Sequence, residues 1–544
     1  MRRPGRAILL FDYNGPLQLA KRRFAARWQA NWAQVDSEGG DMNSALTARR
    51  DEKGDPIATN QRGLKKDALS FLSNVVIGVA STAPAYSLAA ALGSIVAVVT
   101  FKVPAILIVA FVPILFVAAA YYHLNRADPD CGTSFAWVTR AMGPYCGWMA
   151  GWALIVTDIL VMPGLAQVAA LYSFRFFGID HPTWIAQAVV GVGWIAVMTA
   201  ICYLGIELSA RTQKLLLAAE IAILAVFAIV ALAEVYGAAP PAGSQHVALS
   251  WFNPLGVSDS GAFAQAMLIA VFIYWGWDCG ASVNEETINP RIAPARAAVV
   301  SNLVLLGLYV LVAVAAVAFA EPGLEKYTGD DFLAPLATSV LPYWLAKLLV
   351  LAVVTSAVAS TQTTILPTAR TVVSMAHAGA LPKRFGDIHP RYLTPGFATL
   401  VMGVFSIVWY IALWYIPNTD ILSDSVTATA FGIAFYYGLT GLACTLYYRR
   451  ELSKSAKNFV LMGLVPALGG LAMFVLFVMT CQSFIGPDQD NTAIFGLGPK
   501  LVFGVGALVL GVILMVFARI SLPDFFKRKT EVVDMAHVAL AAKD

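Results

Sequence analysis

The most unusual chemistry in this sequence lies in the stretch FIYWGWDCGASVNEE, which runs from Phe272 to Glu286. An apolar run leads into it, and Gly276, Asp278 and Gly280 then fall within five residues. A charged side chain near the centre of a bilayer costs about 2.5–3.5 kcal/mol on insertion scales and is usually functional. Glycine lets the backbone leave helical geometry, which a membrane tolerates only where that backbone lines a cavity or is buried in protein. The stretch therefore predicts a discontinuous membrane helix that forms half of a substrate site.

A second interruption falls in the first apolar run, FLSNVVIGVASTAPAYSLAAALGSIV. Gly78, which we expect among the substrate-binding residues, precedes it. Pro84 removes an amide hydrogen and clashes with the preceding turn, so the helix should kink or open there. Interrupted helices at matching positions of two halves indicate a midplane site in an inverted-repeat transporter. The amides of Ser81, Thr82 and Ala83, with two hydroxyl groups, would then face a substrate carboxylate at the positive end of a half-helix.

The interruption within Phe272–Glu286 would bind the other end of an amino acid. Carbonyl oxygens exposed at Tyr274, Trp275 and Gly276 would accept hydrogen bonds from a substrate ammonium group. Trp275 or Trp277 could close over the substrate and add cation–π attraction. The alternative is that these aromatic side chains simply pack the helix bundle.

Three acidic residues, Asp158, Glu220 and Asp278, lie well inside apolar runs, and the sequence places no Lys or Arg at comparable depth. A buried carboxylate without a counter-charge favours its neutral form, which suits a proton carrier. We expect Glu220 or Asp158 to take up a coupling proton and Asp278 to favour amines. Alternatively, each acid caps a neighbouring helix or satisfies backbone groups.

Hydroxyl side chains recur at helical spacing in the segment TSAVASTQTTILPTAR, at Ser356, Ser360 and either Thr363 or Thr364. Such hydroxyls could bind a sodium ion between this helix and the first one, or serve as ordinary interhelical hydrogen bonds. The sequence leaves sodium and proton coupling open.

The composition is that of a polytopic α-helical membrane protein. Of the 544 residues, 58% are hydrophobic and 13% charged, and the mean hydropathy is +0.69. Soluble domains have about 45–50% apolar and about 25% charged residues. The net charge of +4 does not indicate a nucleic-acid partner, because the basic residues follow the membrane topology. The partners expected are a lipid bilayer, a small amino acid or amine, and a coupling proton or sodium ion.

Apolar runs long enough to cross a bilayer predict twelve spans. They cover about residues 70–98, 103–124, 144–172, 184–205, 214–236, 262–283, 297–320, 343–376, 397–416, 424–447, 459–483 and 499–520. Only five of the 37 Lys and Arg residues fall between odd and even spans, namely Lys102, Arg175, Lys326, Lys347 and Lys500. The positive-inside rule therefore predicts that both termini lie in the cytoplasm. We expect the protein to be in the cytoplasmic (inner) membrane.

The sequence predicts four regions: a tail at 1–67, a ten-helix core at 68–450, two further helices at 451–522, and a tail at 523–544. Within the first tail, LQLAKRRFAARWQANW could form a basic amphipathic helix on the inner leaflet. The alternatives are a disordered tail, or translated upstream sequence before a start at Met42. The six cysteines show no metal-like spacing, and no nucleotide-binding loop or catalytic dyad appears. We therefore expect no enzyme activity, metal or cofactor.

Several blocks resemble one transporter superfamily. They read DPDCGTSFAWVTRAMGPYCGWMAGW before span 3, GWD and NEETINPRIAPARA around span 6, and ARTVVSMAHAGALPKRFGDIHPRYLTP after span 8. Their order is similar to that of the amino acid–polyamine–organocation (APC) superfamily, and Gly276-Trp277-Asp278 resembles the G-F-D of its cationic amino acid transporter branch. The resemblance covers about residues 68–450. It implies a leucine-transporter-type fold, with spans 1–5 and 6–10 as inverted repeats and spans 11 and 12 appended.

The sequence departs from that pattern at two places. The usual glycine-rich G-x-G of span 1 is replaced by Ser81-Thr82-Ala83-Pro84, and Glu220 stands where several branches carry a lysine in span 5. We also expect Glu285 and Glu286, after span 6, to form an inner gate with Arg140 or Arg211, or else to lie in a solvated loop.

These observations predict a secondary active permease for an amino acid or related amine, working by alternating access with proton symport or exchange. Cationic amino acids or polyamines are the first expectation, and small neutral amino acids the second. A membrane sensor that keeps the fold without transport is the alternative from another class. Substrate, direction of transport and oligomeric state stay open.

Overall fold

The computed structural model describes residues 58–319, 332–416, 420–485 and 497–531. The chain divides into two units, residues 1–59 and 60–544, and the helices described below belong to the second unit. The possible amphipathic helix near the N-terminus and the last part of the C-terminal tail lie outside the described residues. Within those residues the chain is helical and forms no sheet strand, as the sequence predicts.

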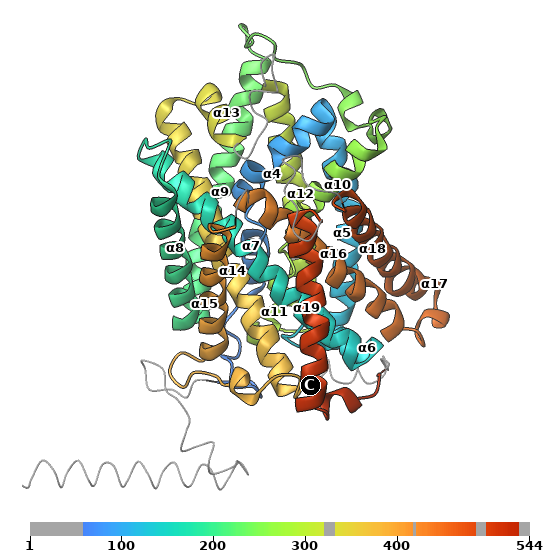
Figure 1. Cartoon of the computed structure of the whole chain (residues 1–544). Helices are drawn as coiled ribbons and strands as arrows, with labels where there is room; N and C mark the ends of the chain where they lie inside the picture. The colour runs from blue at the N-terminus through green and yellow to red at the C-terminus, as the bar shows by residue number, and fades with distance from the viewer. Residues whose placement is uncertain (1–57, 320–331, 417–419, 486–496, 532–544) are drawn as a thin grey trace, which may run out of the picture. The chain divides into compact units, whose positions relative to one another are not determined.

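The first half of the core consists of helices α3 to α9 (Figure 1). Their bounds are α3 Phe71–Ser81, α4 Pro84–Val99, α5 Val103–Ala127, α6 Ser134–Met142, α7 Pro144–Phe176, α8 Trp184–Leu204 and α9 Ile206–Val235.

The second half and the C-terminal addition comprise α10 to α19. Their bounds are α10 Ser260–Tyr274, α11 Cys279–Ser282, α12 Ala293–Phe319, α13 Leu333–Val340, α14 Tyr343–His377, α15 Gly396–Leu413, α16 Ile421–Tyr447, α17 Ala456–Asn458, α18 Val465–Ser483 and α19 Pro499–Ser521.

Local sequence marks several helix ends. Ser70 caps α3 through a reciprocal hydrogen-bonded capping box with Ser73. Asp420 caps α16 by accepting hydrogen bonds from two backbone amides of its first turn. Pro84 and Pro144 stand at the start of α4 and α7, where a missing amide hydrogen costs nothing.

Eleven stretches of the described chain are long and apolar enough to cross a membrane. The first, Phe71–Ala127, has 57 residues. A straight helix of that length would measure about 85 Å, whereas the hydrocarbon core of a bilayer is about 30 Å thick. The stretch breaks after α3 and again at the 3₁₀ turn Thr100–Lys102, so it holds two passes. Split in this way, the eleven stretches correspond to the twelve predicted spans.

Equivalent spans of the two halves pack against each other. α4 contacts α10, α5 contacts α12, α7 contacts α14, and α8 contacts α15. These pairs join spans 1 and 6, 2 and 7, 3 and 8, and 4 and 9, which is the pairing expected of two repeats around a common axis. Four of the five span pairs of the predicted five-plus-five arrangement are thus present in the helix contacts.

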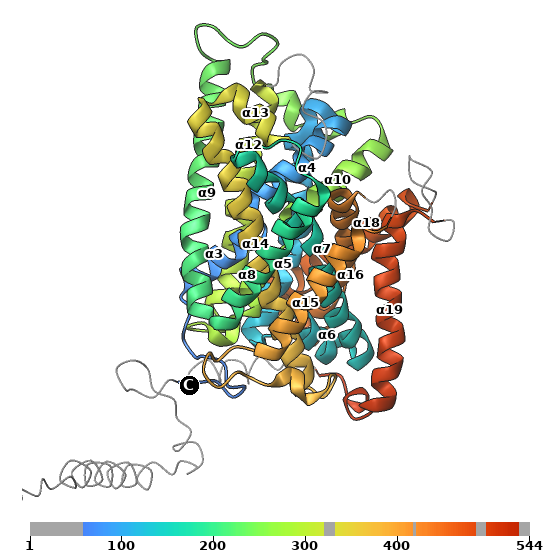
Figure 2. The ribbon, with the colours of Figure 1, turned by 60° about the vertical axis from the view of Figure 1, so that its left-hand side comes forward.

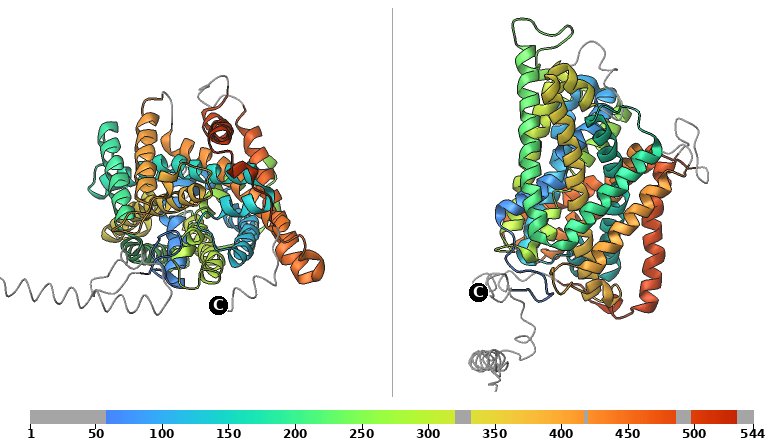
Figure 3. Two further views of the ribbon diagram at one scale, coloured as in Figure 1. Left: turned by 90° about the horizontal axis from the view of Figure 1, so that it is seen from below. Right: turned by 90° about the vertical axis from the view of Figure 1, so that its left-hand side faces the viewer.

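The last two spans lie outside this paired core. α18 packs on α16 and α5, and α19 packs on α16 and α7. Figures 2 and 3 show α19, in red, at the edge of the bundle. The paired spans therefore form the inner bundle in which the candidate site lies.

Candidate functional site

The first span is broken where the sequence predicts. α3 ends at Ser81, and α4 begins at Pro84. Between them Ala83 adopts a left-handed conformation, with φ 47° and ψ 67°. Such a conformation is costly for a residue with a Cβ atom and persists only where its surroundings enforce it.

The sixth span is broken at the matching place. α10 ends at Tyr274 and α11 begins at Cys279, and Gly276 between them has φ 116°. A Cβ atom at Gly276 would lie 2.7 Å from the carbonyl oxygen of Ser81 and 3.0 Å from the amide nitrogen of Thr82. The two breaks therefore touch, backbone against backbone, and glycine is required at their contact.

Glycines also let the half-helices on either side approach. A Cβ atom at Gly78 would lie 3.1 Å from the carbonyl oxygen of Trp277, and one at Gly280 would lie 2.9 Å from that of Asn74. Gly78, which the sequence suggested as a substrate ligand, thus serves close packing of α3 against the break before α11 and against Ser301 of α12 in this structure.

The hydrogen-bonding groups of the first break are largely occupied. The amides of Thr82 and Ala83 donate to the carbonyls of the last turn of α3, at 3.2 and 3.1 Å. The Ser81 carbonyl accepts from the Ser360 hydroxyl at 2.9 Å, which joins α3 to α14. These amides can reach a substrate carboxylate only if the turn that ends α3 opens.

In the second break, carbonyl acceptors remain available. Within the described chain, no amide or side chain donates to the carbonyl oxygens of Tyr274 and Trp275, whereas the Gly276 carbonyl accepts from the amide of Cys279. Two of the three carbonyls expected to bind an ammonium group are therefore open to one.

Asp278 sits in a cage of three phenol groups. Its carboxylate accepts hydrogen bonds from Tyr437 at 2.8 Å, Tyr436 at 3.1 Å and Tyr121 at 3.2 Å. The Trp275 indole donates to the Tyr436 hydroxyl at 2.6 Å, and so links the break to this cage. No Lys or Arg among the described residues makes an ion pair with Asp278, so the phenols alone satisfy a buried carboxylate.

The two tryptophans of the break behave differently. Trp277 is fully buried and packs edge-on against Tyr121, with 4.9 Å between ring centroids. Its indole nitrogen has no acceptor among the described residues. Trp277 is thus part of the bundle in this conformation, as the alternative interpretation held, whereas Trp275, also buried, is held through its indole by Tyr436.

Glu220 joins three helices. Its carboxylate accepts from the amide of Ala85 in the first turn of α4 and from the Ser356 hydroxyl on α14, each at 2.7 Å. The residue itself lies on α9 and is 1% exposed. A carboxylate at the N-terminus of a half-helix complements its dipole. The capping role suggested as an alternative for this acid is therefore present in the structure.

Asp158 and the hydroxyls of α14 lie nearby. The Thr368 hydroxyl donates to Asp158 at 2.5 Å, which ties α14 to α7. The Thr363 hydroxyl donates to carbonyls of its own helix, and the Thr364 carbonyl accepts from Thr368. Two of the expected hydroxyls reach the broken first span: Ser360 donates to the Ser81 carbonyl at the end of α3, and Ser356 accepts from the amide of Tyr86 in α4 at 3.2 Å.

A buried ion pair lies after the sixth span. Arg370 on α14 donates to both carboxylate oxygens of Glu286, at 2.8 and 3.1 Å, and both side chains are 1% exposed. The expectation that Glu286 pairs with Arg140 or Arg211 is wrong. Arg370 is a buried cation that the sequence pattern does not single out, and it pairs with Glu286 rather than with any of the three membrane acids.

Arg62 is the centre of a second cluster of polar side chains at the same end of the bundle. Its guanidinium donates to Asp130, to the Cys131 sulfur and to Glu285, a set we call the Arg62 cluster. Asp130, Cys131 and Glu285 are close enough together to ligate a metal ion, but the Arg62 cation already lies among them. Burial and the neighbouring Glu285 raise the pKa of the Cys131 thiol, which further disfavours metal binding.

The two carboxylates of the Arg62 cluster differ in charge state. Burial opposes ionisation of Asp130, but Arg62, together with hydrogen bonds from Ser374 and Gly132, holds the pKa of this carboxyl below its ordinary value. At Glu285 burial prevails over the attraction of Arg62 and raises the pKa. As the pH falls, Glu285 therefore takes up a proton before Asp130 does, and Asp130 keeps its charge beside Arg62.

The partners of the acids are not evident in the sequence. Tyr121, Tyr436 and Tyr437 come from α5 and α16, far from Asp278 in the chain. The adjacent tyrosines of span 10 were a possible signal, because paired phenols are polar groups inside an apolar run. Arg62 falls in the region 1–67, which the sequence predicts to be a tail.

Comparison with known proteins now adds the family. Residues 67–518 match the profile of a family described as amino acid permease. The chain is 24% identical to the low-affinity putrescine importer PlaP of Escherichia coli over 77% of this chain and 90% of that protein. It is 25% identical to the branched-chain amino acid permease BcaP of Bacillus subtilis over 68% and 79% of the two chains.

A further relative is the vacuolar cationic amino acid transporter 4 of Arabidopsis thaliana, which is 27% identical over 57% of this chain and 52% of that protein. The resemblance to the APC superfamily noted in the sequence is thus confirmed, and these relatives are transporters rather than enzymes. Since the family profile covers most of the sequence, the chain belongs to the amino acid permease family of membrane transporters.

Proposed function

We propose that this chain is a secondary active permease that moves an amino acid or related amine across the cytoplasmic membrane by alternating access. The observation that carries the proposal is the direct contact between the two helix breaks, where Gly276 meets the Ser81–Thr82 peptide. Broken helices that meet inside a bundle supply half-helix ends and free carbonyls to a substrate. The permease family and the transporter relatives support the same function.

The substrate we favour carries a positive charge. Asp278 is a buried carboxylate next to the open carbonyls of Tyr274 and Trp275, and its present partners are hydroxyl groups that an ammonium group can join or replace. One relative is named as a putrescine importer and another as a cationic amino acid transporter. A neutral amino acid is the second candidate, because a third relative is named as a branched-chain amino acid permease.

Proton coupling is proposed to act through Glu220. This carboxylate holds together the start of α4, α9 and α14, so its protonation would weaken the capping of the half-helix that borders the break. Asp158, bound only by Thr368 in the hydrogen bonds described, is the second candidate for the proton. Ser360 is the remaining candidate of a sodium site.

The Arg62 cluster and the Glu286–Arg370 pair would close the cytoplasmic side. Both lie at the end of the bundle to which the positive-inside rule assigns the cytoplasm. Opening toward the cytoplasm would then require these ion pairs to separate, while the two termini stay on that side.

The test is uptake into proteoliposomes of labelled arginine, lysine, putrescine, alanine and leucine, with and without an inward proton gradient. Saturable, gradient-driven uptake of the cationic substrates is the expected result. Gradient-driven uptake of only alanine or leucine would support the permease function but reject the proposal of a cationic substrate. Ligand-induced thermal stabilisation without any flux would reject transport and favour a sensor.

A further inference from the structure

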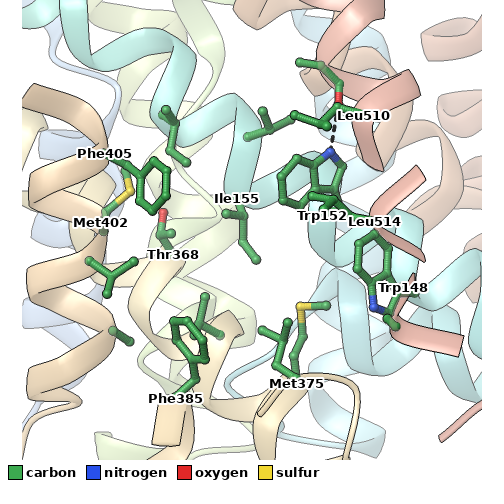
Figure 4. A pocket seen from close by; sticks show the side chains of 18 of the residues that line it. Trp148, Trp152, Ile155, Thr368, Met375, Phe385, Met402, Phe405, Leu510 and Leu514 are labelled. Carbon is green, nitrogen blue, oxygen red and sulfur yellow. Dashed lines mark hydrogen bonds between the residues drawn. The ribbon is translucent and has the colours of Figure 1, made fainter. Parts of the chain in front are cut away.

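A long apolar groove lies outside the candidate substrate site, between α7, α14, α15 and α19 (Figure 4). Its volume is about 790 Å³, and we call it the α19 groove. The walls include Trp152, Ile155, Thr368, Met402, Phe405 and Leu510. Along α19 its lining runs from Val502 to Leu522, which at 1.5 Å per residue is about 30 Å, the thickness of the hydrocarbon core.

The groove offers water almost nothing to bind. The Thr368 hydroxyl, which reaches the wall, is engaged by Asp158 at 2.5 Å. The Trp152 indole donates to the carbonyl of Ala507 at 2.8 Å. A buried water needs two to four polar partners, and apolar cavities without them stay dry. The groove therefore calls for an apolar occupant.

The occupant reaches the groove from the bilayer. Phe405 and Phe517 line it and are 58% and 63% exposed, so the opening faces the lipid between α15 and α19. A flexible hydrocarbon chain can follow this groove along α19, and a second copy of the chain is the alternative occupant that the test below distinguishes.

One end of the groove carries positive charge. The Arg384 guanidinium lies 4.4 Å from the ring centre of Phe397, and Phe397 contacts Phe385, which lines the groove. Arg519 follows Ala518, another lining residue, at the same end of α19. Neither arginine makes an ion pair with a carboxylate in the described part of the chain. Basic residues at the membrane end of an interhelical pocket attract anionic lipid head groups.

The groove also contains a buried hydrogen-bond donor without an acceptor. Trp148 also lines the groove and is 2% exposed, yet its indole nitrogen has no acceptor among the described residues. An unpaired buried N–H group costs free energy unless something binds it. The ester carbonyl of a glycerolipid is an acceptor that follows directly on an acyl chain.

We propose that the α19 groove binds an anionic glycerophospholipid, with an acyl chain along α19 and the phosphate near Arg384 and Arg519. The lipid would rest on Thr368, and through it on the Asp158 contact that joins α7 to α14. It would thus act on the helices that frame the substrate site without entering that site.

Native mass spectrometry of the purified protein, exposed to phosphatidylglycerol or phosphatidylcholine in mild detergent, tests the proposal. Gly506 lines the groove, and a Cβ atom there meets nothing within 4 Å, so Gly506→Leu should fill the groove without a clash. We expect this variant to lose the tightly bound phosphatidylglycerol. Gly307→Leu is the matched control, because Gly307 is exposed on α12, away from the groove, and also meets nothing within 4 Å.

A second variant tests the head group without altering the groove. Arg384→Gln with Arg519→Gln should reduce the preference for phosphatidylglycerol over phosphatidylcholine about fivefold for each charge removed. Equal binding by wild type and both Gly506→Leu and Gly307→Leu would overturn the proposal, as would a preference that the arginine variants leave unchanged. A shift from dimer to monomer in Gly506→Leu alone, without lipid loss, would also overturn it by pointing to a second copy of the chain.

Discussion

Asp278 is the residue on which the charge of the substrate most depends. Asp278→Asn keeps an oxygen for the phenol groups but removes the negative charge. Charge-assisted hydrogen bonds are worth about 1.5–3 kcal/mol, so we expect the KM for a cationic substrate to rise about 10- to 100-fold. Uptake kinetics in proteoliposomes measure this change, and the uptake of a neutral substrate should change much less.

Tyr437→Phe serves as the comparison for that variant. It removes the shortest of the three phenol contacts to Asp278 and leaves the charge in place. We expect at most a severalfold change in KM, since one neutral hydrogen bond contributes about 0.5–1.5 kcal/mol. If Asp278→Asn behaves no differently from Tyr437→Phe, the charge of Asp278 has no part in substrate choice.

Glu220→Gln separates capping from proton transfer. The amide oxygen of glutamine can still accept from Ala85 and Ser356, but the side chain no longer binds and releases a proton. We expect uptake driven by a proton gradient to disappear while exchange of internal for external substrate continues. If uptake driven by a proton gradient is unchanged, a residue other than Glu220 carries the coupling proton. Asp158→Asn is then the next variant to measure.

The sequence reveals which residues are unusual, but not what they touch. Asp158, Glu220 and Asp278 stand out because an acid in an apolar run is costly. The sequence does not identify their partners, because Thr368 is an ordinary member of a helix and Ser356 is one of several regularly spaced hydroxyls until the fold brings both to the acids. The capping of α4 by Glu220 likewise depends on a contact across 135 residues of chain.

The break in the sixth span should tolerate no side chain at its centre. Gly276→Ala would force a Cβ atom to within 2.7 Å of the Ser81 carbonyl and require a positive φ of a residue that disfavours it. We expect a loss of about 1–3 kcal/mol in stability and a severe loss of transport. Thermal melting in detergent and uptake measure the two effects.

Gly307→Ala is the matched control, since its Cβ atom meets nothing within 4 Å. It should melt at or slightly above the wild-type temperature, because alanine favours a helix more than glycine does. A melting temperature for Gly276→Ala equal to that of Gly307→Ala would contradict the close contact between the breaks.

The positions of the helix breaks can be predicted from the sequence more readily than the backbone groups that are free to bind a substrate there. Glycine and proline act on their own backbone, so Pro84 and Gly276 mark the breaks in the sequence itself. The amides of Thr82 and Ala83 were expected to be free, yet they complete the last turn of α3. Whether a helix end closes on itself depends on the surrounding packing, which no local pattern encodes.

At the scale of the whole molecule, the Glu286–Arg370 pair links the segment after α11 to α14. Both charges are buried, so Glu286→Gln would leave the Arg370 charge without its partner. Such changes cost about 3–5 kcal/mol. We expect a lower melting temperature and, if the pair closes one side of the protein, a greater accessibility of that side to charged thiol reagents.

The exchange of both charges, Glu286→Arg with Arg370→Glu, is the matching control. It keeps a pair of opposite charges in the same place, so it should recover part of the stability lost by Glu286→Gln. No recovery, with normal expression of both proteins, would show that the surroundings rather than the pair determine the effect. The sequence did not reveal this pair, because the two residues are 84 positions apart.

Arg62 has a practical consequence for handling the protein. The residue lies just inside the second compact unit, which begins at Asn60, and it binds Asp130 and Glu285. A truncation that starts at Asn60 would keep these contacts, whereas one that starts at Asp67 would remove them and leave two carboxylates without their cation. Affinity tags and cleavage sites are therefore best placed before Thr59, so that trimming the N-terminus does not itself alter the behaviour being measured.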